Sequence, residues 1–98
     1  MVTTDLYRDA VGKYGKEHQL LVTAGELAEC AAEIARHMIP DREHDEQDLI
    51  DELADVSIML GQMEVIYGEK LTNAIFKKLN KLRKHIEEDS YDIQQQSN

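Results

Sequence analysis

Four carboxylates stand in two pairs that share one spacing. Glu26 and Glu29 lie three residues apart in the segment GELAEC, and Glu52 and Asp55 lie three residues apart in IDELADV. Side chains three apart on an α-helix project side by side, so each pair could present its acidic oxygens to one point. If the two rows face each other across two helices, the four carboxylates converge.

The second pair stands in one of the most apolar runs of the chain. One side of the expected helix would be covered by Leu49, Leu53, Val56, Leu60 and Met63, and much of the rest by Ile58 and Val65. A carboxylate withdrawn from water must be protonated, paired with a base or bound to a cation. Carboxylate oxygen is the ligand that Mg²⁺ or Mn²⁺ selects, and the missing His and Cys ligands argue against zinc. We therefore expect a divalent cation to bind these acids.

The elements that position the carboxylates are expected to be helices. Ala, Leu, Ile, Glu and Lys dominate the 98 residues, there is one proline, and no strand signal is visible, which favours an all-α fold. Apolar periodicity predicts four helices over residues 5–14, 16–38, 48–67 and 71–89. Gly68 is expected to cap the third helix in the left-handed conformation. We expect a single domain over 1–98, with a frayed tail from about 90 to 98.

The predicted faces of these helices indicate an oligomer. The row that contains Glu26, Glu29 and Glu33 lies away from the apolar stripe of its helix, on a face that at first looks solvated. The third helix is apolar nearly all round, so it should be buried on more than one side. A chain of 98 residues can hardly cover such a helix alone, so we expect at least a dimer.

Composition excludes several classes of function. The net charge of −9 argues against general nucleic-acid binding, because that affinity comes mostly from Lys and Arg. The single Cys30 excludes an internal disulfide and is expected to be a packing residue. No leader and no apolar run of about 18 residues is present, so we expect a cytoplasmic protein without a membrane span.

The two acidic pairs resemble a family signature. GELAE, followed after 22 residues by ELAD, is similar to the motif of the MazG-like nucleoside triphosphate pyrophosphohydrolases of the all-α NTP pyrophosphatase superfamily. The resemblance covers most of the chain and includes Gln19, Gln62 seven residues after Asp55, and the basic last helix KKLNKLRKH. The family's first glutamate is replaced here by Gly25.

The resemblance implies a fold, a reaction and a site. It implies a four-helix MazG-like fold, with a bundle completed by homo-oligomerisation as a dimer or tetramer. The reaction is Mg²⁺-dependent, with Mn²⁺ as the alternative ion, and cleaves between the α- and β-phosphates of a nucleoside triphosphate to release a monophosphate and pyrophosphate. The implied metal ligands are Glu26, Glu29, Glu52 and Asp55, of which Glu29, Glu52 and Asp55 are also catalytic. The implied substrate contacts are Gln19, Gln62, Lys78, Lys81 and Lys84. Glu29 or Glu33 would orient the attacking water.

Two alternatives stay open. A non-catalytic helical module on the same fold would bind a nucleotide or a protein, and Gly25 in place of the first glutamate favours this reading. A phosphoribosyl-ATP pyrophosphohydrolase normally carries an aromatic residue and a histidine shortly after its aspartate, whereas DVSIML has neither. A di-iron carboxylate bundle needs Glu-x-x-His pairs, which the predicted helices lack.

Overall fold

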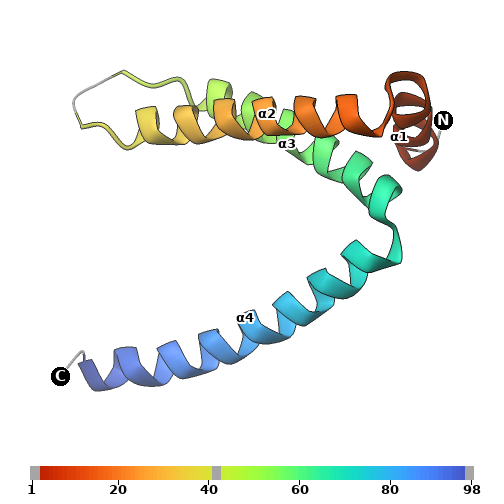
Figure 1. Ribbon diagram of the computed structural model, residues 1–98. Helices are drawn as coiled ribbons and strands as arrows, with labels where there is room; N and C mark the ends of the chain where they lie inside the picture. Colours follow the sequence, from red (N-terminus) through yellow and green to blue (C-terminus); the bar gives the residue numbers. More distant parts are fainter. Residues whose placement is uncertain (1–2, 41–42, 97–98) are drawn as a thin grey trace. The chain divides into compact units, whose positions relative to one another are not determined.

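The computed structural model describes residues 3–40 and 43–96, with side chains to residue 89. It contains four helices, α1 (Thr3–Tyr14), α2 (Lys16–His37), α3 (Glu46–Tyr67) and α4 (Glu69–Gln96), and no strand among these residues (Figure 1). The predicted all-α fold class and the number of helices are confirmed. No helix in the described part of the chain is both long and apolar enough to cross a lipid bilayer.

The chain divides into two compact units, residues 1–67 with α1 to α3 and residues 68–98 with α4. The single domain predicted over 1–98 stays a prediction. Gly68 has φ +55, which confirms the predicted left-handed cap of α3, and its carbonyl accepts the first backbone bonds of α4. The helix then runs to Gln96, seven residues beyond its predicted end at Asp89, because no glycine or proline interrupts SYDIQQQ.

Helices α2 and α3 run antiparallel beside each other (Figure 1). The residues buried between them are mostly polar or sulfur-containing: Gln19, Thr23 and Cys30 from α2, and Met59, Gln62 and Met63 from α3. Cys30 is a packing residue, as expected. The acidic side of α2 thus faces α3, whereas the apolar stripe of α2 is exposed. Its residues Leu20, Leu27 and Ile34 keep 36%, 46% and 45% of their surface accessible.

A buried amide pair sets the register of α2 against α3. The side-chain Nε2 of Gln19 donates a hydrogen bond of 2.7 Å to Oε1 of Gln62. The Thr23 hydroxyl donates to the Gln19 carbonyl, and Nε2 of Gln62 lies 3.6 Å from the Met59 sulfur. Leaving a buried amide unpaired costs about 1–3 kcal/mol, so sliding either helix along the other is unfavourable.

Helix α1 packs against α3 through an aromatic ring. The ring of Tyr7 lies directly over Gly61, where a Cβ would approach Cδ2 and Cζ of the ring to 2.9 Å. Only a residue without a side chain allows this approach. Tyr7 therefore packs α1 against α3.

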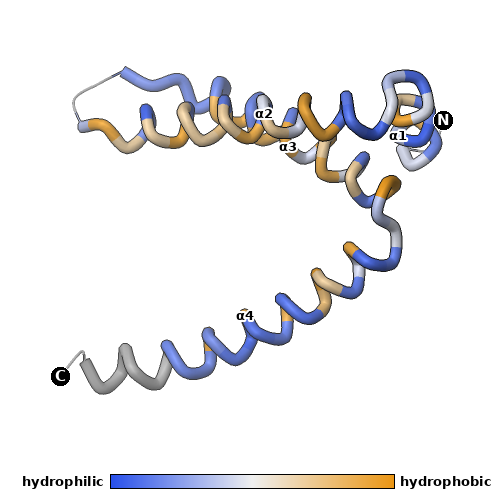
Figure 2. Tube along the Cα trace, in the orientation of Figure 1, coloured by the Kyte–Doolittle hydropathy of each residue, from blue (hydrophilic) through white to orange (hydrophobic). Residues whose placement is uncertain are grey.

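Helix α4, taken by itself, is amphipathic. Apolar residues recur along an otherwise hydrophilic helix (Figure 2). Residues 70–86 contain six Lys or Arg and no acidic residue. One side of it carries the apolar residues Leu71, Ile75, Leu79, Leu82 and Ile86.

A substitution at Gly61 tests the packing of α1 on α3, and a substitution at Gly25 in α2 serves as the comparison. Gly61→Ala should destabilise the protein by about 1–3 kcal/mol, because the methyl group would overlap the Tyr7 ring. Gly25→Ala should instead stabilise it by about 0.5–1 kcal/mol, because Gly25 lies inside α2 and nothing lies within 4 Å of its Cβ position. Thermal unfolding followed by circular dichroism measures both. A melting temperature that Gly61→Ala leaves unchanged would contradict the proposed Tyr7 contact.

Candidate metal centre

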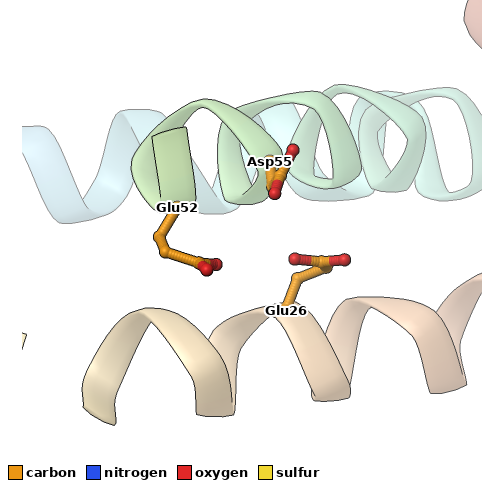
Figure 3. Close-up of side chains that lie close together, drawn as sticks. All are labelled: Glu26, Glu52 and Asp55. Atoms are coloured by element: carbon orange, nitrogen blue, oxygen red, sulfur yellow. The ribbon is translucent and has the colours of Figure 1, made fainter. Parts of the chain in front are cut away.

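Three carboxylates from two helices meet between α2 and α3. One carboxylate oxygen from each of Glu26, Glu52 and Asp55 lies within 4.8 Å of the other two. The Glu26 side chain points from α2 toward α3, and Glu52 and Asp55 project from α3 toward α2 (Figure 3). Glu26 lies 26 positions before Glu52 in the sequence, so the pairing of the two helices brings its carboxylate to the other two.

Helical periodicity explains the depth of each side chain. Glu26 lies three residues after Thr23 and four before Cys30, so it shares the side of α2 that packs on α3. Glu52 lies seven residues before Met59 and takes the same side of α3. Both glutamates are half-buried, whereas Asp55, one turn further on, is exposed. The cluster is therefore half-buried at Glu26 and Glu52 and open to solvent at Asp55.

The two half-buried carboxylates are poorly compensated. Oε2 of Glu26 and Oε2 of Glu52 are both buried without a hydrogen-bond partner. Burial raises the pKa of Glu26, and the charges of Asp55 and Glu29 raise it further. Burial also raises the pKa of Glu52, followed by the charges of Glu29, Asp55 and Glu26. Over residues 3–40 and 43–89, no Lys, Arg or His forms an ion pair with this trio.

Glu29 and Glu33 lie beside the cluster. Glu29 is exposed and is not one of the three converging residues, although its charge contributes to the raised pKa of Glu52. Glu33 also contributes there, but its carboxylate already accepts hydrogen bonds from the Arg36 guanidinium. The structure thus brings together three of the four predicted ligands and places the fourth within electrostatic range.

The residues predicted to contact substrate fall into two groups. Gln19 and Gln62 are buried and bonded to each other in the α2/α3 interface. Lys78, Lys81 and Lys84 are exposed on α4, which belongs to the other unit. A role in substrate binding stays a prediction for all five residues.

Two histidines near the end of α2 form a pair that was not predicted from the sequence. The rings of His37 and His44 stack with centroids 4.9 Å apart, and Nδ1 of His37 lies 3.6 Å from Oε1 of Glu33. His44 is exposed, and its Nε2 lies 3.0 Å from the Ile39 carbonyl oxygen. The signal for His37 was its place seven residues after Cys30, on the buried side of α2.

The donor set of the cluster fits a hard divalent cation. It consists of carboxylate oxygens only, which Mg²⁺ and Mn²⁺ accept. Two of these oxygens are buried without a partner, so a cation there would supply the missing interaction. Glu26, Glu52 and Asp55 could hold such an ion, with Glu29 at the side.

The raised pKa of Glu52 predicts a dependence of stability on pH in metal-free buffer. A carboxyl whose pKa lies above its usual value of 4.5 stabilises the fold while protonated, and this stability is lost as the pH rises through the raised pKa. Glu52→Gln should therefore raise the melting temperature at pH 7, and its advantage over the wild type should vanish near pH 4. Glu43→Gln in the connecting loop is the control for charge alone. An equal gain from Glu43→Gln would refute the local cause.

No family model matches this sequence, and neither a curated protein nor a solved structure matches it.

Proposed function

We propose that the protein is a Mg²⁺-dependent nucleoside triphosphate pyrophosphohydrolase, which cleaves the α–β phosphate bond and releases a nucleoside monophosphate and pyrophosphate. One observation carries the proposal: Glu26, Glu52 and Asp55 converge from two helices, and two of their oxygens are buried without a partner. The segments that contain these acids, GELAE and ELAD, also resemble the motif of the MazG-like pyrophosphohydrolases.

Each carboxylate has a separate task in this proposal. The half-buried Glu26 and Glu52 would hold the ion. Asp55, which is exposed, would complete the coordination of the ion on the side where the substrate binds. A bound Mg²⁺ supplies charge neutralisation of the phosphates and lowers the pKa of a coordinated water. Glu29 would orient the attacking water, because the carboxylate of Glu33, the other candidate, is already bonded to Arg36.

The charges of the chain explain why binding of a triphosphate would depend on the ion. Residues 1–67 contain fifteen Asp or Glu and five Lys or Arg, a net charge of −10. Such a surface repels a polyanion, and the repulsion falls only when cations intervene. Lys78, Lys81 and Lys84 would hold the outer phosphates, and Gln19 and Gln62 would support the substrate from the α2/α3 interface.

The proposal also covers assembly and location. The enzyme would act as a homo-oligomer, a dimer or a tetramer, because α2 and α3 expose apolar stripes along their length. We expect it to act in the cytoplasm, where nucleoside triphosphates are available as substrates.

Activity of single-residue variants tests the proposed roles. Asp55→Asn and Glu29→Gln should each lower kcat at least about 100-fold, because phosphoryl transfer depends on positioning and charge neutralisation. Lys81→Ala should instead raise KM with a small effect on kcat, because a phosphate contact acts in the ground state and the transition state alike. The measurement is monophosphate and pyrophosphate release from a panel of nucleoside triphosphates with Mg²⁺.

Matched controls separate the site from general loss of negative charge. Glu43 and Asp45 lie in the loop between α2 and α3. The variants Glu43→Gln and Asp45→Asn should hydrolyse nucleotides at near-normal rates. Release of two orthophosphates in place of pyrophosphate would refute the reaction. Unchanged turnover by Asp55→Asn would refute the site, and a wild type that turns over no nucleotide would favour the non-catalytic binding module.

A further inference from the structure

Two aromatic rings lie together where α1 joins α2. The rings of Tyr14 and His18 stack with their centroids 5.6 Å apart and an angle of 27° between their planes. Both residues are exposed, and Tyr14 keeps 51% of its surface accessible. By contrast, Tyr7, the ring that packs α1 on Gly61, is half-buried. Packing alone therefore does not account for the exposed pair.

The orientation of the His18 ring is fixed from the α2/α3 interface. Nδ1 of His18 lies 2.7 Å from Oε1 of Gln19, and because this oxygen can only accept a hydrogen bond, Nδ1 carries the proton and donates it. Gln19 is itself bonded to Gln62. The ring is thus held by the buried amide pair on one side and by Tyr14 on the other. A ring that is already held in place loses little conformational entropy when it binds a ligand.

An open pocket adjoins the two rings. It has a volume of about 520 Å³, which is within the range of small-molecule sites, and is lined by Tyr14, Gly15, Lys16, Glu17 and His18. Gly15 has φ +89 and forms the turn that brings the end of α1 beside the start of α2. The turn between the two helices therefore forms this pocket.

One row of residues on α2 connects the ring pair with the carboxylate cluster. Four residues at intervals of four, three and four share one side of the helix, namely His18, Val22, Gly25 and Glu29. Glu29 lies beside the cluster, since its charge raises the pKa of both half-buried glutamates. Nothing lies within 4 Å of the Cβ position of Gly25. The row therefore leaves space for a ligand that reaches from the rings to the cluster.

The length of this path suits a nucleotide. His18 precedes Glu26 by eight residues, which is about 12 Å along the helix axis. The sugar and phosphates of a nucleoside triphosphate span a comparable distance between the base and the phosphate chain. A substrate whose phosphates lie at a cation in the cluster would thus place its base at the ring pair.

We propose that Tyr14 and His18 bind the base of the nucleotide substrate by stacking. The proposal rests on the proposed function and adds the part of the substrate that the carboxylates do not bind. Every base has a π face, so stacking on these rings favours a nucleotide over an inorganic polyphosphate and does not select one base. The rival arrangement has phosphates in the pocket, because Nζ of Lys13 lies 5.5 Å from the centroid of the Tyr14 ring and Lys16 lines the pocket.

Contacts between base and protein test the location. The probes are nucleoside triphosphates in which a methylene group bridges the α- and β-phosphates, so that the wild type binds them without cleavage. With Mg²⁺ present, NMR should show through-space contacts from the base protons to the rings of Tyr14 and His18. The ring of Tyr67, which is 40% exposed and lies 5.1 Å from Nζ of Lys16, should show none. Base contacts to other residues, with none to Tyr14 and His18, would overturn the proposal.

Binding by variants measures the size of the effect. Tyr14→Leu should raise the Kd of the methylene-bridged nucleotides about tenfold, because it removes a stacking surface. Tyr14→Phe keeps the ring and should bind as the wild type does, and Tyr67→Leu is the matched control that should leave the Kd unchanged. Inorganic tripolyphosphate has no base, so Tyr14→Leu should not change its Kd. Equal weakening of tripolyphosphate and nucleotide by Tyr14→Leu would place phosphate in the pocket and overturn the proposal.

Turnover separates this proposal from the proposed function. Pyrophosphate release by the wild type together with base contacts elsewhere would overturn the stacking site and leave the reaction intact. Base contacts at Tyr14 and His18 without pyrophosphate release from any nucleotide would support the stacking site and overturn the reaction.

Discussion

The pairing of α2 and α3 through a polar side is the constraint on which the rest of this structure depends. Two half-buried glutamates with unpartnered oxygens lie in that interface, and burying such groups costs free energy unless something compensates them. Interfaces of this kind are expected where the polar groups have a task, because an apolar interface of the same shape would be more stable. The raised pKa values of Glu26 and Glu52 show that their charged forms are under-compensated in the chain alone.

Other features of the unit that contains α1 to α3 follow from this pairing. The Gln19 and Gln62 amides satisfy each other and so hold the register that places Glu26 opposite Glu52 and Asp55. Since the polar sides are used between the helices, most leucine and isoleucine residues of α2 and α3 are left exposed. The contact between Tyr7 and Gly61 covers one side of α3 with α1 and leaves Leu53 and Leu60 exposed.

Much of this arrangement could be predicted from local sequence signals. Apolar periodicity and the glycine at position 68 located the helices to within two residues, apart from the end of α4. The three-residue spacing of the acids led to the expectation that four carboxylates converge; Glu26, Glu52 and Asp55 do so, whereas Glu29 stays exposed beside them. The depth of the acidic side of α2 was harder to predict, because a row of glutamates is normally solvated and only the pairing with α3 buries it. The contact of Tyr7 with Gly61 and the stacking of His37 on His44 depend on tertiary approach and leave no local pattern. The extension of α4 beyond Asp89 was not predicted, because the polar segment SYDIQQQ has too few apolar residues to show a helical period.

The central claim is that the carboxylates between α2 and α3 bind a divalent cation, and paramagnetic broadening by Mn²⁺ tests it most directly. In NMR spectra of the ¹⁵N-labelled wild type, substoichiometric Mn²⁺ should first broaden the amide signals around Glu26, Glu52 and Asp55, and excess Mg²⁺ should restore them. The loop residues Glu43 and Asp45 carry exposed negative charge outside the cluster and should be affected only at higher concentration. Broadening that begins at that loop and spares Glu26 and Glu52 would contradict the claim.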